Sequence, residues 1–164
     1  MNMKFWLFIL TLLLSLLLEN AAIAEREHLP LPRFVTIKSS EANVRTGPNF
    51  RYPIAWVYAK KGEPVEILAE FEQWRKIRDK YGDGGWIHES MLSGKRGIII
   101  NGNHLKIIYR KADDTSPRIA QLEPEVRAEL ISCHKGWCNI QIKNYRGWIK
   151  ASDVWGVYLK EEEK

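Results

Sequence analysis

Two cysteines have the most definite chemistry in this chain. Cys133 and Cys138 are its only cysteines, and four residues separate them. On a β-hairpin this spacing sets them opposite one another, with Cα atoms about 4.5–5.5 Å apart, inside the range that a disulfide needs. A catalytic thiol would instead need a low pKa, a cleft and an ordered base, and the neighbouring His134 would point to the other face of its strand. We therefore expect a structural disulfide.

Other catalytic or metal-binding patterns are missing from the sequence. The four histidines are scattered over the leader, a closing turn and two loops: His28, His88, His104 and His134. None has the spacing of a zinc site. Asp79 and Asp83 share one loop, whereas the paired carboxylates of a glycoside hydrolase straddle a cleft. No phosphate-binding loop or nucleophile motif occurs. We expect no enzymatic activity, no metal and no cofactor.

Aromatic residues are the remaining candidates for function. Six tyrosines and tryptophans fall within 35 residues: Tyr52, Trp56, Tyr58, Trp74, Tyr81 and Trp86. A small barrel of about 60 residues buries only a few such side chains fully. One or two should therefore line a surface groove, where rings stack on sugars or prolines and a nearby Arg or Lys meets carboxylates. Most should be core residues, and the loop residues Tyr52 and Tyr81 are the better candidates for exposure.

We take six residues as candidate ligand contacts: Arg45, Tyr52, Trp56, Trp74, Tyr81 and Trp86. For Arg45 two interpretations stay open. It could anchor an irregular loop by hydrogen bonds, or it could contact the ligand.

A pattern that occurs twice predicts the elements that carry these residues. The first copy is Trp74-Arg-Lys-Ile77, a polar turn and Gly85-Trp-Ile87; the second is Trp137-Cys-Asn-Ile140, a polar turn and Gly147-Trp-Ile149. This pattern is typical of a β-hairpin whose large side chains share one face. Its repetition indicates two small β domains in tandem.

Further strands are expected around each hairpin. In the first domain they are residues 34–37, 42–45, 54–57 and 64–71, followed by the hairpin and a single helical turn at 88–92. Gly47 and Pro48 should tighten the turn after the second strand, and Gly85 should allow close backbone approach before Trp86. In the second domain, strands are expected at 98–100, 105–110, 119–122 and 126–132. Asn101-Gly102-Asn103 predicts a hairpin between the first two of these.

The order of several short motifs resembles a known family. These motifs are Asn43-Val-Arg-Thr-Gly-Pro48, Tyr52-Pro-Ile54, Lys61-Gly62, Pro64-Val-Glu-Ile67, Trp74 and Gly85-Trp-Ile87. Together they resemble bacterial SH3-like (SH3b) domains. The longer stretches at residues 52–58 and 64–67 are similar to an exported subfamily with two such domains in tandem. The resemblance covers residues 34–92 closely and 97–156 more loosely. It implies all-β barrels of five or six strands and, in many members, association with cell-wall or envelope material.

The N-terminal residues 1–24 predict a secretory signal peptide. Lys4 supplies positive charge, an apolar run extends from Phe5 to Leu18, and Ala22-Ile-Ala24 is a small-x-small cleavage site. The run is shorter than the roughly 20 residues that cross a bilayer. An uncleaved anchor is the alternative. We expect cleavage after Ala24, a periplasmic protein and no stable membrane anchor.

The resulting organisation has five parts: a signal peptide at 1–24, an extended leader at 25–33, SH3-like domains at 34–93 and 97–158, and a charged tail at 159–164. The joint at 93–97 is short, so the domains are expected to act as one body. The net charge of +5 is spread without a block of five like charges, so nucleic acid is not an expected partner.

Three functional hypotheses follow. The first is a non-catalytic exported module that binds an envelope ligand, either a cell-wall peptide or a periplasmic protein. The second is an adaptor without wall affinity. The third, which we rank last, is a cell-wall enzyme that uses Cys138 or the Asp79 loop.

Overall fold

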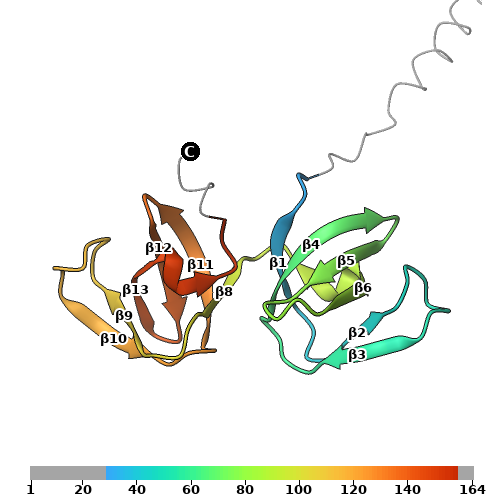
Figure 1. Ribbon diagram of the computed structural model, residues 1–164, viewed down its shortest axis with the longest axis horizontal. Helices are drawn as coiled ribbons and strands as arrows, with labels where there is room; N and C mark the ends of the chain where they lie inside the picture. Colours follow the sequence, from blue (N-terminus) through green and yellow to red (C-terminus); the bar gives the residue numbers. More distant parts are fainter. Residues whose placement is uncertain (1–28, 159–164) are drawn as a thin grey trace, which may run out of the picture. The chain divides into compact units, whose positions relative to one another are not determined.

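The computed structural model describes residues 29–158, and the chain folds there into two antiparallel β-sheets (Figure 1). The expected signal peptide, its cleavage site and the charged tail lie outside the described residues. Within residues 29–158, none of the helices has the length and apolar character needed to cross a bilayer.

The first sheet contains β1 (Arg33–Ile37), β2 (Ala42–Arg45), β3 (Ile54–Tyr58), β4 (Pro64–Phe71), β5 (Trp74–Arg78), β6 (Gly84–His88) and β7 (Leu92–Ser93). Its strand order is β3-β2-β6-β5-β4-β1-β7. The second sheet contains β8 (Gly97–Ile100), β9 (Lys106–Tyr109), β10 (Arg118–Leu122), β11 (Arg127–His134), β12 (Trp137–Ile142), β13 (Tyr145–Lys150) and β14 (Val154–Trp155). Its order, β10-β9-β13-β12-β11-β8-β14, repeats the first order strand for strand.

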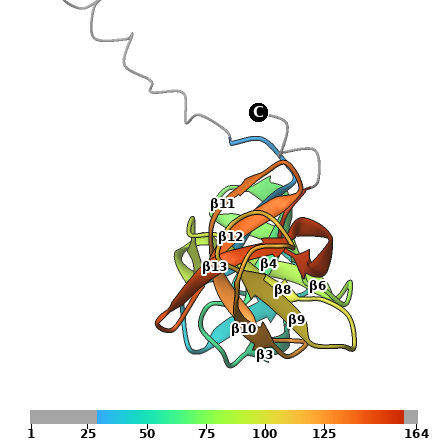
Figure 2. The ribbon, with the colours of Figure 1, turned by 90° about the vertical axis from the view of Figure 1, so that its left-hand side faces the viewer.

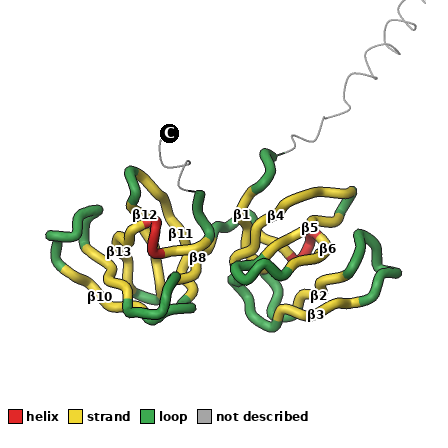
Figure 3. Tube along the Cα trace, viewed as in Figure 1, coloured by secondary structure: helices red, strands yellow, loops and turns green. Residues whose placement is uncertain are grey.

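Each sheet curves back on itself (Figure 3, and turned by 90° in Figure 2), and each barrel has its own apolar core. The first core gathers fully buried side chains such as Val44, Ile77 and Ile87, and the second gathers Ile108, Ile140 and Ile149. These residues are at the inward-facing positions, which alternate with outward-facing positions along each strand. Short 3₁₀ turns, η2 (Glu89–Met91) and η3 (Ala151–Asp153), precede the last strand of each sheet. The all-β fold with two tandem barrels and the single helical turn after the first hairpin are confirmed.

The expected hairpin at Asn101-Gly102-Asn103 is wrong. β8 pairs with β11 and β14, whereas β9 pairs with β10 and β13. Gly102 does turn the chain with a positive φ of 88°. The two strands nevertheless diverge, because each finds its partner elsewhere in the sheet.

The disulfide is confirmed. Cys133 and Cys138 face one another across β11 and β12, with Cα atoms 4.0 Å apart. The turn is tighter than the sequence indicated: His134 still pairs with Trp137, and Lys135 and Gly136 alone reverse the chain with positive φ values of 47° and 80°. Positive φ at both central positions matches the twist of the flanking strands.

From Leu31 onward the described residues belong to one compact unit. Side chains of the two barrels meet within it. The Phe34 ring lies 5.0 Å from that of Trp155 and 4.7 Å from that of Tyr158. The Tyr158 hydroxyl donates to Glu66, and Arg127 pairs with Glu63. These contacts agree with the expectation that a short joint keeps the barrels together.

Candidate binding groove of the first barrel

A groove of about 530 Å³ opens on the outer face of the first barrel. Parts of β2, β3, β4, β5 and β6 line it, together with the loop before β6. Its lining residues are Arg45, Thr46, Ala55, Trp56, Leu68, Lys76, Ile77, Arg78, Gly82, Gly84, Gly85 and Trp86. We call this set the first-barrel groove. It brings together three of the six candidate contacts, Arg45, Trp56 and Trp86.

Trp86 has a cationic residue beside it on each neighbouring strand. On β6 it pairs with Arg45 of β2 on one side and with Lys76 of β5 on the other. Its neighbour Ile87 is fully buried, whereas the Trp86 side chain is half-buried. Adjacent residues of a strand point to opposite faces, so Ile87 belongs to the core and Trp86 to the outer face. A half-exposed indole therefore lies between two cationic neighbours.

The cations of the groove are only partly neutralised. Arg78 pairs with the buried carboxylate of Glu66 at 2.5 Å. Arg45 donates to backbone carbonyls, and within residues 29–158 Lys76 has no ion pair or side-chain hydrogen bond. Of the described residues, no Asp or Glu lines the groove. The groove therefore combines aromatic surface with an excess of positive charge, which suits a ligand that carries carboxylates.

Arg45 holds the loop that follows β2. Its guanidinium donates to the carbonyl oxygens of Tyr52 at 2.7 Å and Phe50 at 3.1 Å. Gly47 is required inside this loop, because a Cβ there would lie 2.6 Å from the Tyr52 ring. Arg45 thus anchors the loop, and the same side chain lines the groove. The structure supports loop anchoring directly, and a ligand contact by Arg45 stays a prediction.

The remaining candidates lie outside the groove lining. Tyr52 and Tyr81 are 47% and 69% exposed, as expected of loop residues. Trp74 is only 5% exposed, because its ring packs against those of Phe50 and His88 at 4.9 and 5.5 Å. Phe50 itself is 66% exposed. A ligand contact by any of the three candidates stays a prediction. Phe50 packs on Trp74 and exposes its own ring there in place of the indole.

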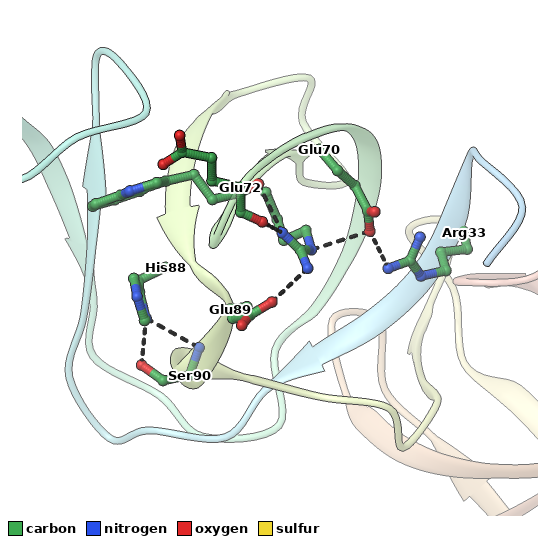
Figure 4. Close-up of polar contacts among 8 residues, drawn as sticks. Arg33, Glu70, Glu72, His88, Glu89 and Ser90 are labelled. Atoms are coloured by element: carbon green, nitrogen blue, oxygen red, sulfur yellow. Dashed lines mark hydrogen bonds and ion pairs between the residues drawn. The ribbon is translucent and has the colours of Figure 1, made fainter. Parts of the chain in front are cut away.

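An ion-pair network borders this aromatic cluster (Figure 4). Glu70 accepts from Arg33, and Arg75 reaches both Glu70 at 3.0 Å and Glu89 at 2.5 Å. Arg75 also donates to the Glu72 carbonyl oxygen at 2.8 Å. The network joins β1, the β4–β5 hairpin and η2, and so fixes the end of the hairpin that carries Trp74.

The loop at Asp79 is an organised turn. One carboxylate oxygen of Asp79 accepts the backbone N–H groups of Tyr81 and Asp83 at 2.9 and 3.0 Å, and the other accepts the Tyr58 hydroxyl at 3.2 Å. Burial, followed by the charge of Asp79, raises the pKa of Tyr58 well above its ordinary value. Asp79 is thus occupied in holding its own loop. In the described part of the chain, no three His, Cys, Asp or Glu side chains gather as metal ligands would.

The second barrel carries different residues at the equivalent positions. Trp148 occupies the place of Trp86, and its cross-strand partners are Tyr109 and Asn139 instead of Arg45 and Lys76. Gln141 pairs with Glu129 as Arg78 pairs with Glu66, and Ala120 faces Ile108 as Trp56 faces Val44. All three cations and one indole of the groove are therefore replaced by neutral residues.

Sequence reasoning missed Lys76, Arg78 and Leu68 as groove residues. A signal for the first two was present, because Lys76 and Arg78 alternate with the fully buried Ile77 on a short strand. Leu68 likewise alternates with the buried Ile67 on its own strand. It is exposed at a bulge between Ile67 and Ala69, where the alternation of β4 shifts.

Several solved structures are similar to this chain. An NlpC/P60 family protein from Bacillus cereus is 13% identical, with a TM-score of 0.34 over 74% of this chain and 55% of that one. NlpC2 and NlpC1 from Trichomonas vaginalis are 15% and 12% identical, each with a TM-score of 0.34, over 77% and 78% of this chain and 44% and 47% of theirs. The chain thus spans about half the length of each of these proteins. No curated protein sequence matches it.

The family itself is established by a sequence match. The model of the bacterial SH3 domain matches residues 38–94 and again residues 105–156, which together exceed half of the chain. The two matched stretches fall on the two sheets of identical strand order. The chain therefore belongs to the bacterial SH3 domain family, of which it carries two copies in tandem.

Proposed function

We propose that the chain is a non-catalytic, exported binding module whose first-barrel groove takes an envelope ligand. One observation carries the proposal: Trp86 is flanked across the sheet by Arg45 and Lys76, whereas its counterpart Trp148 is flanked by neutral residues. Such a difference between two similar barrels is expected if the first barrel binds the ligand and the second barrel supports the first.

The ligand that fits best is an extended peptide that bears carboxylates. An indole face packs on apolar or planar groups, and the neighbouring cations meet carboxylates at the rim. A cell-wall peptide has this chemistry, and so does an acidic segment of a periplasmic protein. We place the cell-wall peptide first.

The groups that a hydrolytic mechanism would need are engaged elsewhere. Cys138 is bonded to Cys133, and the Asp79 carboxylate accepts two hydrogen bonds from its own loop and one from the Tyr58 hydroxyl of β3. A nucleophilic thiol must be free, and a general base must have an accessible lone pair. Both facts support a binding role over a catalytic one.

Export rests on the sequence of residues 1–24. The short apolar run and the Ala22-Ile-Ala24 site support cleavage and release into the periplasm. The intact mass of protein recovered from the periplasmic fraction tests this, and the first residue should be Glu25. A mass that retains residues 1–24 would instead indicate an anchored protein.

Binding to purified sacculi tests the groove. Trp86→Ala should weaken sedimentation with sacculi by about tenfold or more, as truncation of a central aromatic contact does. Trp148→Ala removes the equivalent indole from the second barrel and serves as the matched control, with little effect expected. Lys76→Gln should weaken binding in a salt-dependent way without loss of stability, because its side chain has no ion pair or hydrogen bond in the part of the chain that the structure describes.

Two outcomes would contradict the proposal. Equal recovery of wild-type protein with and without sacculi would remove the wall-binding version and leave a periplasmic partner protein, which crosslinking would identify. Equal weakening by Trp86→Ala and Trp148→Ala would remove the groove as the site.

A further inference from the structure

A second cavity lies where the two barrels meet, away from the first-barrel groove. It measures about 450 Å³. The end of β1, the turn before β4, the joint, and the β11 and β12 strands form its wall. We call it the interbarrel pocket. Its lining residues are Thr36, Ile37, Lys38, Lys61, Gly62, Ser93, Lys95, Arg96, Gly97, Arg127, Ala128, Glu129, Gln141, Ile142 and Lys143.

Contacts between the barrels fix the pocket's walls. The Thr36 hydroxyl donates to the Lys95 carbonyl oxygen at 3.0 Å, and a Cβ on Gly97 would lie 2.9 Å from the Thr36 methyl group. Arg127 of β11 pairs with Glu63, a first-barrel carboxylate that is 7% exposed. Loss of Arg127 would leave the buried carboxylate of Glu63 without its ion-pair partner, which would destabilise the fold. The pocket is therefore a built part of the fold.

The charge of the pocket is strongly one-sided. Among residues 29–158, six cationic side chains line it, namely Lys38, Lys61, Lys95, Arg96, Arg127 and Lys143, against the single carboxylate of Glu129. Glu129 lies 3.8 Å from Lys95, and Glu63 neutralises Arg127. Arg96 donates to the Gly156 carbonyl oxygen at 3.0 Å.

Three lysines of the pocket have no partner in the described part of the chain. Within residues 29–158, the side chains of Lys38, Lys61 and Lys143 make no ion pair or hydrogen bond. Lys143 also holds its place at a positive φ of 51°, where a side chain is unfavourable and Gly or Asn is usual. Like charges around one cavity repel one another, and a bound anion relieves that repulsion.

We propose that the interbarrel pocket binds a phosphate-bearing anion. The three unpartnered lysines call for more than one negative charge in a compact group. A phosphate monoester supplies about −1.5 to −2 charges and three acceptor oxygens at pH 7, whereas a carboxylate supplies one charge. Lysine ammonium groups act as point charges that meet such oxygens without a fixed planar geometry. The phosphate reaches the pocket on a soluble ester or on a lipid headgroup.

Calorimetric titration of the purified protein with inorganic tripolyphosphate at low ionic strength tests the site. The variant K38Q/K61Q/K143Q should weaken binding by about tenfold or more. The matched control K60Q/K111Q/K135Q removes the same charge: Lys60 precedes Lys61, Lys111 is exposed like Lys38, and Lys135 has a positive φ of 47° like Lys143. The control should retain binding, and both variants should melt close to the wild type.

Vesicles distinguish the two sources of phosphate. Sedimentation with phosphatidylcholine vesicles that contain phosphatidic acid should show the same dependence on the three lysines if the headgroup enters the pocket. Binding of tripolyphosphate but not of these vesicles assigns a soluble ester. Absence of binding to either probe, equal weakening by both triple variants, or tighter binding of citrate than of tripolyphosphate would overturn the proposal. Trp86→Ala should leave this titration unchanged, so the outcome is independent of the groove.

Discussion

The two cysteines stabilise the second barrel in different ways. Cys138 is fully buried and packs with Ile140 and Ile149 in the core, whereas Cys133 is half-buried at the edge of that core. The turn at Lys135 and Gly136 already sets the register of the two strands. The bond therefore closes a very short loop, for which the chain-entropy estimate is only about 2 kcal/mol.

Removal of the disulfide should cost stability and leave binding intact. Cys133→Ala with Cys138→Ala should lower the free energy of unfolding by about 2 kcal/mol for the loop, and by about 1 kcal/mol more for the lost core sulfur. Urea denaturation measures the change, and sacculus binding well below the melting temperature should persist because the groove lies in the first barrel. Thiol titration of the native protein should detect no free thiol. A free thiol, or lost binding with an unchanged melting temperature, would contradict the structural role.

At the scale of strands, each of the three residues of the repeated Gly-Trp-Ile motif has a different structural role. A Cβ on Gly85 would lie 2.8 Å from the Arg45 carbonyl oxygen, and one on Gly147 would lie 2.8 Å from that of Tyr109. The glycine thus lets β6 or β13 pass close to the second strand of its barrel. The isoleucine is fully buried in both copies, and the tryptophan stays half-buried on the outer face.

Substitution of Gly85 should therefore disturb both the fold and the groove. Gly85→Ala should destabilise the protein by about 1–3 kcal/mol, because the new methyl group meets backbone that cannot yield easily. Gly94→Ala is the control, since nothing lies within 4 Å of a Cβ there, and its effect should stay within about 0.5 kcal/mol. Thermal unfolding of the two variants compares them. Equal melting temperatures would show that β2 moves aside freely.

Features set by local chemistry were predictable from the sequence. The Gly-Trp-Ile hairpins, the cysteine pair and the strand at Pro64–Phe71 depend on alternation and turn residues a few positions apart. The pairing of β8 was not predictable, because a strand chooses among partners far away in sequence and Asn101-Gly102-Asn103 is compatible with more than one of them. The groove's tryptophans and Arg45 were therefore among the candidates, whereas the position of Lys76 beside Trp86 depends on the pairing of β5 with β6.

At the scale of the whole molecule, Glu125 connects the two barrels. The backbone N–H of Glu125 donates to the Ile100 carbonyl oxygen, and in the first barrel that of Gly62 donates to the Ile37 carbonyl oxygen. Both residues have a positive φ, 65° for Glu125 and 85° for Gly62. Glu125 therefore stands where the first barrel uses glycine, at a cost in backbone strain. Its carboxylate accepts from Lys80 and from the Tyr81 hydroxyl of the first barrel. The strained position is compensated by contacts that join the barrels.

These contacts should be sensitive to acid. The hydrogen bond from Lys80, followed by that from Tyr81, lowers the pKa of Glu125 below its ordinary value of 4.5. A carboxylate whose pKa is lower in the folded state stabilises the fold fully above the unfolded value, and this contribution is lost as pH falls through the folded pKa. Glu125→Gln should therefore destabilise the protein at neutral pH, and its difference from the wild type should shrink below about pH 4.5. The pKa of Asp113 is also lowered, by hydrogen bonds from Thr115, but both proteins share this group and it cancels in the difference. Urea denaturation from neutral pH to about pH 3 measures the effect. A difference that stays constant with pH would show that the Glu125 charge does not hold the barrels together.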